Sequence, residues 1–369
     1  MYVLLFIVVV FVLCCGLYRV SQNFYVNALS KKFGEYIFVA FLFIVTLSRY
    51  NVGHDYHTYY EYLTGNSIWA EQFFEPIPRY VLILAKLLSS PFLFFAIMNS
   101  LILIFVLKAI HEESDNEFES LCIFLTLFYL GTLSIVRQWL GVAFVFYGFR
   151  YIRQRKFFYY LVMVILATMC HYSAILSIAI YFIYNYINAK ISIILCIGSM
   201  IFGNRILSIL LSFPFLSSYS HYFEVLYIQG GTKSILIWYM MFVFSLLVYL
   251  KVKNRKDIEK LFSVVCYSII FPILLGPSIG RRLSDYFTVY YIYLLPLCFN
   301  KIKAYGLRLF FMLPFYMYHT MFLIVDSRND RGFADWTWYF LKDGLSSLTT
   351  WGGRKYSVNK KGGFLCVKY

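Results

Sequence analysis

Apolar residues occur along this chain in long runs that are separated by short polar segments. A membrane-spanning helix needs about 20 predominantly apolar residues, and runs near this length recur through most of the sequence. The pattern therefore predicts an all-α membrane protein. Single runs cover Met1–Tyr18, Phe33–Ser48, Tyr80–Leu107, Ile191–Leu211, Ile235–Leu250, Leu261–Gly276, Tyr286–Phe299 and Leu307–Val325. The first lacks the basic start and the cleavage site of a signal peptide, so we interpret it as a spanning helix.

Two further runs, Leu121–Ile152 and Phe157–Ile187, are too long for one helix each. A helix of more than about 30 residues is roughly 45 Å long, against a hydrocarbon core of ~30 Å. Polar residues interrupt the runs near their midpoints, Arg137-Gln138 in the first and His171 in the second. Each run is either one helix with a polar group in mid-bilayer or a hairpin of two short, re-entrant or broken helices around a wet cavity.

The basic residues favour the hairpins. With an external N-terminus and two hairpins, the basic loops 150–156 and 251–260 face the cytoplasm, as the positive-inside rule expects. If both runs were single helices, the cluster Arg150–Lys156 would move outside. The hairpin also removes Arg137 from the bilayer centre, where an arginine costs ~2.5–3.5 kcal/mol on insertion scales. By the same count the basic tail stays outside.

The amino-acid composition also indicates a membrane protein, and it limits the kinds of partner that the chain can have. The chain is 61% hydrophobic and 14% charged, whereas a soluble domain has roughly 25% charged residues. We expect one polytopic membrane domain over residues 1–325 and a basic C-terminal tail over 326–369. The net charge of +15 is explained by basic residues flanking helices, so no nucleic-acid partner is expected. The eight cysteines lack paired spacing and indicate neither a disulfide framework nor a metal site.

Polar residues from four separate stretches of the chain fall on the external face in this topology. Charges inside or beside a membrane that converge on one face are a functional-site hypothesis by default. The residues are Arg49, Asp55, Tyr56, Arg137, Gln138, His171, Arg281 and Arg282.

An ordered set of motifs lies on these stretches. It comprises R-x-x-x-G-x-D-Y-x-x-Y at 49–59, Glu75-Pro76, Arg137-Gln138 opening an apolar helix, and His171 followed by Tyr-Ser-Ala. In order and spacing, residues 36–300 resemble the EpsG-type branch of bacterial polysaccharide polymerases, with which Wzy-type O-antigen polymerases belong. The sequence departs from that pattern in Trp139-Leu140-Gly141 after the arginine, and the tail 335–338 (Asp-Trp-Thr-Trp) fits only loosely.

The resemblance implies a fold, a reaction and partners. The fold would have about 10–12 membrane helices, similar to that of glycosyltransferase C enzymes. The enzyme would join oligosaccharide repeat units carried on undecaprenyl diphosphate at the outer face of the inner (cytoplasmic) membrane. It would contact membrane lipid and a chain-length regulator protein, and it would need no cofactor. The absence from the sequence of a Gly-rich nucleotide cradle agrees with a lipid-diphosphate donor.

The chemistry of this reaction suggests roles for the residues. Arg49 and Arg137 suit a diphosphate, because a guanidinium binds phosphate oxygens with two parallel hydrogen bonds. Asp55 or a histidine, His171, could take the proton of the acceptor hydroxyl. The expected substrate-binding residues are Arg49, Gly53, Tyr56, Tyr59, Gln138, Arg281 and Arg282, and the expected catalytic residues are Asp55, Arg137 and His171.

Structural alternatives stay open for most of these residues. Arg49 and the pair Arg281-Arg282 could be interfacial anchors, Asp55 could be an ion-pair partner, Gln138 could cap a helix and His171 could be a buried histidine. His54 and His57 could bind a metal, but no third ligand has suitable spacing and no D-x-D, HExxH or CxxC motif occurs.

Three rival functions also remain. A flippase for lipid-linked oligosaccharides would usually carry an internal repeat, and we find no convincing match between the two halves. A non-catalytic assembly partner would not explain basic residues at one rim. An O-antigen ligase shares the chemistry and is the hardest to exclude.

Overall fold

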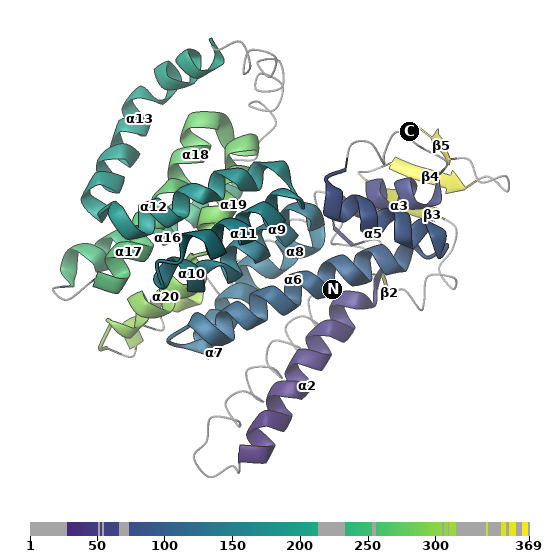
Figure 1. The fold of residues 1–369 in the computed structure, drawn as a ribbon, viewed down its shortest axis with the longest axis horizontal. Coiled ribbons are helices and arrows are strands. Elements are labelled where there is room, and N and C mark those ends of the chain that lie inside the picture. The colour runs from purple at the N-terminus through teal and green to yellow at the C-terminus, as the bar shows by residue number, and fades with distance from the viewer. Residues whose placement is uncertain are drawn as a thin grey trace. The chain divides into compact units, whose positions relative to one another are not determined.

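The computed structural model describes residues 28–50, 52–53, 55–65, 74–212, 233–252, 256–304, 306–308, 310–314, 337–338, 348–351, 354–358 and 364–367. Most of them are helical (Figure 1). The helix expected at Met1–Tyr18 and most of the tail lie outside the described residues. The chain divides into two compact units. Unit 1 holds Met1–Leu103, Leu125–Trp139 and Tyr316–Tyr369, and unit 2 holds Ile104–Phe124 and Leu140–Phe315. The predicted division into residues 1–325 and 326–369 stays a prediction.

Unit 1 contains the segment with the first motif. Helix α2 (Ala28–Leu47) leads into a two-residue strand, β1 (Arg49–Tyr50), and a short helix, α3 (Tyr56–Thr64), follows. Strand β1 pairs antiparallel with β2 (Thr337–Trp338), with Arg49 opposite Trp338. The tail therefore returns to the start of the first motif, a contact that the hydropathy pattern does not predict. The other described strands of the tail, β3 (Leu348–Trp351), β4 (Arg354–Val358) and β5 (Phe364–Val367), form an antiparallel sheet.

The apolar run Tyr80–Leu107 is not the single run that the sequence predicts. It belongs to two helices, α5 (Pro76–Leu87) and α6 (Pro91–Glu113). Ser89 between them has a φ of 49°, in the left-handed region that ends helices. Pro91 disfavours a helical conformation in the residue before it and suits the first turn of a new helix. The proline explains a break that hydropathy alone does not show.

The first long run is broken beside Arg137 and folds back on itself. Helix α7 (Glu117–Ile123), a π-helical turn (Phe124–Phe128) and α8 (Tyr129–Ser134) form the first half, and α9 (Val136–Tyr147) and α10 (Phe149–Arg153) form the second. At one end the Ser120 hydroxyl donates to the Ile292 carbonyl (2.7 Å). Phe146, from the other half, stacks on Tyr293 at a centroid distance of 4.6 Å. Because both ends of the run reach the same short segment, the predicted hairpin is confirmed.

The second long run is a hairpin with its break at the histidine. Helix α11 (Phe157–Thr168) is followed by a 3-10 turn (Tyr172–Ser177) and α12 (Ile178–Tyr186). His171 has an extended backbone, with a φ of −157° and a ψ of 120°. The Tyr181 hydroxyl donates to the carbonyl of Arg155 (2.9 Å), which lies just before α11. The two ends of this run therefore also meet, as the polar interruption predicts.

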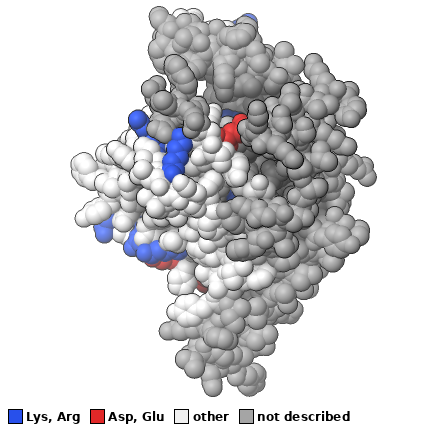
Figure 2. Space-filling view, turned by 90° about the vertical axis from the view of Figure 1, so that its right-hand side faces the viewer, with Lys and Arg blue, Asp and Glu red and all other residues white. Residues whose placement is uncertain are grey.

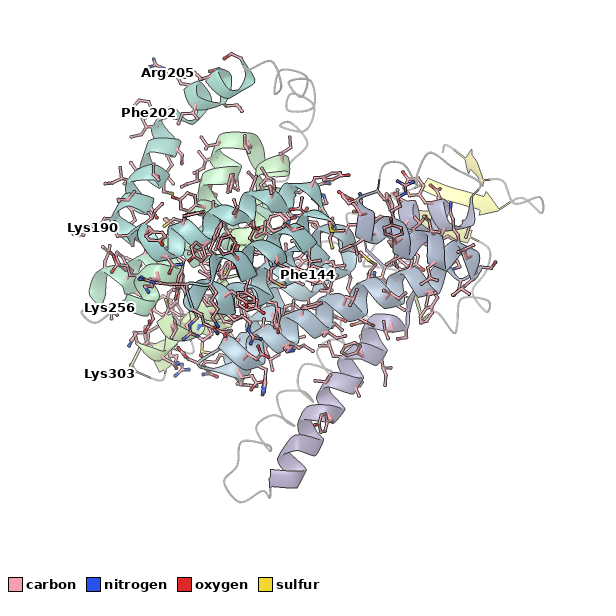
Figure 3. All side chains as sticks on the ribbon, viewed as in Figure 1. Phe144, Lys190, Phe202, Arg205, Lys256 and Lys303 are labelled. Carbon is pink, nitrogen blue, oxygen red and sulfur yellow. The ribbon has the colours of Figure 1, made fainter. Side chains whose placement is uncertain are left out.

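The remainder of unit 2 is built from helices of varied length. Helix α13 (Ala189–Leu211) packs against α17 (Lys256–Val265) and α18 (Tyr267–Leu275). Figure 3 shows Lys190 and Arg205 toward opposite ends of α13, with Lys256 near the Lys190 end. The other described helices of this part are α16 (Lys233–Lys251), α19 (Arg281–Thr288) and α20 (Tyr291–Asn300), and a π-helical turn (Gly276–Gly280) precedes α19.

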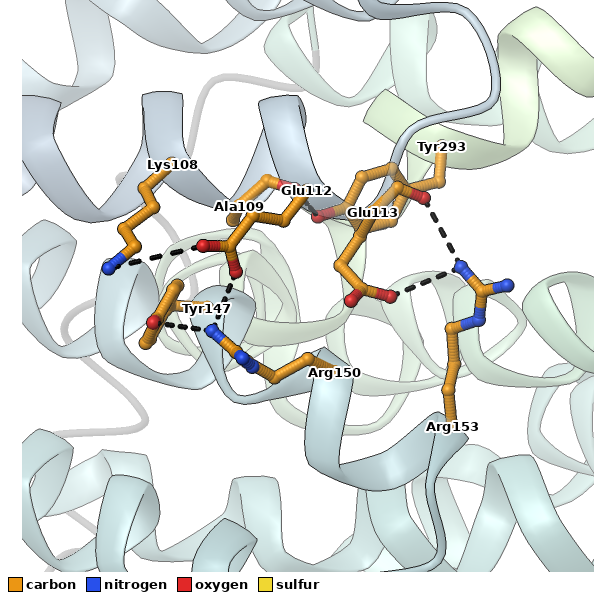
Figure 4. A network of polar contacts seen from close by, with 8 residues as sticks. All are labelled: Lys108, Ala109, Glu112, Glu113, Tyr147, Arg150, Arg153 and Tyr293. Atoms are coloured by element: carbon orange, nitrogen blue, oxygen red, sulfur yellow. Dashed lines mark hydrogen bonds and ion pairs between the residues drawn. The ribbon is translucent and has the colours of Figure 1, made fainter.

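A network of charged side chains joins α6 to α10, just before the turn between the two hairpins (Figure 4). The Arg150 guanidinium lies 2.6 Å from the Glu112 carboxylate, and the Arg153 guanidinium lies 3.1 Å from the Glu113 carboxylate. Lys108 approaches Glu112 at 3.9 Å. The basic loop that the sequence places in the cytoplasm thus has its positive charges partly matched by the acidic end of α6.

The helices have the lengths and surfaces of membrane segments. Among the described residues, three helical stretches are long and apolar enough to cross a membrane: Pro91–Glu113, Glu117–Ser134 and Lys256–Leu275. Shorter apolar helices include Phe157–Thr168 and Tyr291–Asn300. Large apolar side chains such as Phe158, which is 78% exposed, face outward. On the described surface in Figure 2, Lys and Arg occur in small groups between broad uncharged areas.

Candidate functional site

Arg137 lies at the break in the first long run and is held by two side chains of unit 1. Its Nη1 atom lies 2.7 Å from Oε2 of Glu75, and its Nε atom donates to the Tyr59 hydroxyl at 3.2 Å. The guanidinium also stands 4.4 Å from the centroid of the Phe74 ring. The Arg137 side chain is 24% exposed, whereas that of Glu75 is 6% exposed. The buried Glu75 and Tyr59 side chains thus hold the guanidinium, and part of the Arg137 side chain stays accessible.

Glu75 turns toward Arg137 because its own helix offers it little. It occupies the N-cap position of α5, where a side chain normally accepts a hydrogen bond from one of the first backbone N–H groups. The first and third helical residues are Pro76 and Pro78, which have no N–H. Accordingly, the Glu75 side chain makes no cap hydrogen bond. A buried carboxylate needs a partner, and the Arg137 guanidinium supplies it.

Arg49 is buried deeper than Arg137 and makes backbone contacts. It is 2% exposed, and its Nη1 atom donates to the carbonyls of Val52 (3.2 Å) and Leu133. Its Nε and Nη2 atoms have no hydrogen-bond partner among the described residues. The guanidinium lies between the rings of Tyr56 (5.9 Å) and Phe95 (5.4 Å). Arg49 therefore ties the first motif to the end of α8, and its predicted phosphate contact stays a prediction.

Gly53 allows the first motif to approach that same end of α8. Its φ is +102°, which residues with a side chain rarely adopt. A Cβ atom at this position would collide with the backbone carbonyl of Leu133 and lie 3.0 Å from Cα of Ser134. Gly53 is therefore a turn glycine, and the turn holds the two polar segments in contact, while its predicted substrate contact stays a prediction.

The two motif tyrosines are packed on one face of α3. Tyr56 is 5% exposed and stacks on Phe95 at 4.3 Å. Tyr59 is 3% exposed, contacts Phe74 at 5.8 Å and presents its hydroxyl to Arg137. Asp55 precedes α3 at its N-cap and is close enough to Tyr59 for an electrostatic interaction. Unit 1 thus brings Arg49, Asp55, Tyr59 and Arg137 into one neighbourhood, while sugar contacts of the tyrosines stay predictions.

Gln138 and the aromatic residue after it are both buried. Gln138 is 3% exposed, and Trp139 is 4% exposed. The Trp139 ring meets the Phe128 ring at 5.9 Å, across the break. The bulky residue that departs from the family pattern is therefore accommodated against the opposite half of the hairpin. The predicted substrate contact of Gln138 stays a prediction.

Unit 2 carries the second group of predicted site residues. The Nδ1 atom of His171 lies 2.7 Å from the Ser173 hydroxyl, which in turn lies 3.2 Å from the Tyr286 hydroxyl. Tyr286 belongs to α19, the helix that begins with Arg281 and Arg282, and α19 packs against the 3-10 turn after His171. Arg282 is exposed and Arg281 is partly buried. The structure therefore places the histidine next to the helix with the two arginines.

The described residues hold no group of three or more His, Cys, Asp or Glu side chains that could bind a metal ion. His54 lies outside the described residues, as does the side chain of His57.

One residue of the site had no role in the sequence interpretation. Glu75 was noted as part of a motif, but its pairing with Arg137 spans 62 positions in the chain. The signal in the sequence is the pattern Glu-Pro-Ile-Pro at 75–78, because a proline at the third helical position removes one of the two usual donors to an N-cap carboxylate.

The fold and these polar groups define a polytopic helical membrane protein with charged residues at helix breaks. The chain belongs to the EpsG family, whose family model matches residues 32–339. Membership of this family suggests a role like that of a polysaccharide polymerase, in polysaccharide biosynthesis at a membrane. No curated protein and no solved structure matches the chain significantly.

Proposed function

We propose that this protein is a glycosyltransferase that joins oligosaccharide repeat units into O-antigen or a similar surface polysaccharide. Both units are carried on undecaprenyl diphosphate, and the reaction takes place at the outer face of the inner membrane. The growing glycan leaves its lipid diphosphate and is transferred to a hydroxyl of the incoming unit. The family membership supports the polymerase class, and the geometry around Arg137 supports the diphosphate donor.

The observation that carries this proposal is the position of Arg137. Its guanidinium is partly exposed at a helix break and is fixed by Glu75 and Tyr59 on two of its nitrogens. A planar guanidinium stays charged and matches the geometry of phosphate oxygens. Negative charge grows on the departing diphosphate in the transition state, and a preoriented cation lowers that barrier. The ion pair with the buried Glu75 carboxylate keeps the arginine at the helix break while no diphosphate is bound.

The other residues then have supporting roles. Arg49 and Gly53 hold the first motif against the end of α8, and so they set the position of Arg137. Asp55, Tyr56, Tyr59 and Gln138 stand near the acceptor or donor sugar. In unit 2, His171 is a second candidate for handling the acceptor proton, and Arg281 and Arg282 would contact phosphate or sugar. A chain-length regulator would bind the protein as a partner.

The deciding experiment is a gel of surface polysaccharide from a deletion strain. Loss of a polymerase should leave surface lipid that carries a single repeat unit. Loss of a flippase or of a ligase should leave lipid without any repeat unit, so the same gel separates the rival functions. A normal ladder in the deletion strain would refute the polymerase proposal.

A further inference from the structure

In the Arg137–Glu75 ion pair, the Glu75 carboxylate occupies a nitrogen that Arg137 would need for binding a diphosphate. This inference rests on the proposed polymerase function. In the structure, Nη1 of Arg137 is occupied by the Glu75 carboxylate at 2.7 Å. A diphosphate that is to be gripped by both edges of the guanidinium must compete with that carboxylate. Binding therefore requires the ion pair to open.

Opening the pair changes the chemistry of Glu75. While Arg137 is beside it, the carboxylate has a matched charge. Once the guanidinium turns to the diphosphate, Glu75 is left as an unpaired carboxylate in a site where it is 5% exposed. A buried carboxylate without a cation lacks a hydrogen-bond donor, and a substrate hydroxyl placed beside it can supply one. Its own helix offers little instead, because Pro78 removes one of the two usual capping N–H groups and the Glu75 side chain makes no cap hydrogen bond.

We propose that Glu75 is the proton acceptor of the polymerase reaction. Its ion pair with Arg137 keeps the carboxylate inactive until a lipid diphosphate draws the guanidinium away from Glu75. The acceptor hydroxyl loses its proton to Glu75 as its oxygen forms the new bond to the anomeric carbon. The bond from that carbon to the diphosphate oxygen breaks, and the electron pair leaves with the diphosphate, whose charge Arg137 stabilises. Glu75 then returns the proton to water and pairs with Arg137 again.

This exchange couples donor binding to catalysis. The base becomes available when the diphosphate is in place, so the site does not activate a hydroxyl without a donor. Tyr59 can keep the Arg137 side chain in place during the exchange, because the Tyr59 hydroxyl accepts from Nε of Arg137 and not from Nη1. The sequence interpretation gave the base to Asp55 or His171. Glu75 is favoured here because its contact with the diphosphate-binding arginine is established.

The test is a pair of measurements on Glu75→Gln, which removes the charge and keeps the size. In lipid nanodiscs, the full-length variant should bind undecaprenyl diphosphate more tightly than the wild type. The gain is about tenfold if the native pair is closed nine-tenths of the time. In membranes from a deletion strain, which contain the natural lipid-linked units, chain extension should fall by about 100-fold or more. A purely structural salt bridge predicts instead that binding and extension both weaken.

Glu61→Gln is the matched control, because Glu61 is an exposed glutamate on the neighbouring helix α3, and it should leave both quantities unchanged. If Glu75→Gln does not accumulate, Glu75→Asp replaces it. A carboxylate shortened by one methylene should bind the diphosphate at least as well as the wild type and extend chains about tenfold more slowly. Extension by Glu75→Gln or Glu75→Asp at the wild-type rate, or weaker diphosphate binding by either, would overturn the assignment. Failure of the wild type itself to restore a ladder would instead refute the polymerase function.

Discussion

Arg49 donates a hydrogen bond to the backbone carbonyl of Leu133, although 84 positions separate the two residues. Leu133 lies near the end of α8, four residues before Arg137. The same guanidinium atom contacts the carbonyl of Val52 inside the first motif. Arg49 therefore fixes the distance between two polar segments of unit 1 from a buried position, and substitutions there should act on stability as well as on activity.

Arg49→Ala should destabilise the protein. It leaves two buried carbonyls without their donor, which costs about 1–3 kcal/mol for each unsatisfied group. Arg49→Lys should recover part of that loss, because an ammonium can reach one carbonyl but lacks the fork that serves two. The measurement is the thermal unfolding midpoint of the purified protein in detergent. Arg79→Ala is the control, since Arg79 is exposed. Equal midpoints for Arg49→Ala and Arg79→Ala would contradict the role given to Arg49.

Gly53→Ala tests the close approach of the first motif to the Leu133 carbonyl. The added methyl group would meet the Leu133 carbonyl, and the positive φ of 102° is strained for alanine. We expect lower abundance in the membrane and shorter glycan chains. Gly198→Ala is matched to it, because a Cβ atom on Gly198 has no neighbour within 4 Å. A Gly53→Ala protein with wild-type abundance and glycan length would show that the close approach is unnecessary.

Cysteine labelling tests the topology that places the site outside. In a cysteine-free background, a cysteine at Gln154 should resist a membrane-impermeant reagent applied from outside, because the loop after α10 is predicted to be cytoplasmic. A cysteine at Ser134, beside the break, should react with it. The reverse pattern would mean that Arg137 and the basic loop have exchanged sides and that the proposed site is wrong.

The sequence predicts the helix breaks well because their causes are local. A polar residue in the middle of an apolar run, such as Arg137 or His171, is costly in lipid and marks the place where the chain turns. The basic residues of loop 150–156 likewise carry a topological signal that needs no partner. The break before Pro91 does not follow from the hydropathy of the run as a whole, although Ser89, Ser90 and the proline are visible in the sequence.

The pairings within the site could not be predicted in the same way. The contacts of Glu75 with Arg137 and of Arg49 with Leu133 join segments that are distant in sequence. A charged residue in an apolar run must have a partner when it is buried. The hydropathy pattern does not show which of the polar residues elsewhere in the chain is that partner. The antiparallel pairing of β1 with β2 depends likewise on the return path of the tail. Local patterns therefore identify the residues, and the tertiary contacts assign them to one another.

Ser173→Ala tests the role of the histidine in unit 2. Ser173 binds Nδ1 of His171 and also reaches the Tyr286 hydroxyl. If His171 takes part in the reaction, the loss of this hydrogen bond should cost about 1 kcal/mol in orientation, or roughly fivefold in the rate of chain extension. Ser173→Thr keeps the hydroxyl and should retain most of the rate. A Ser173→Ala enzyme with the wild-type rate would place His171 among structural residues.

The strongest test of the whole site is the comparison of alanine and lysine at Arg137. Arg137→Ala removes the cation that meets the departing diphosphate. The loss of one transition-state donor costs ~2.7–4 kcal/mol, or 100- to 1,000-fold in rate, and the loss of a charged donor should reach or exceed that range.

Arg137→Lys keeps the charge, but an ammonium lacks the planar fork that holds two phosphate oxygens. It should therefore recover only part of the extension. An interfacial anchor would behave differently, because lysine extends to the interface as well as arginine does. Glycan length on a gel, at equal membrane abundance of the variants, decides between the two roles. Full-length ladders from Arg137→Lys would show that the arginine fixes topology and does not grip a diphosphate.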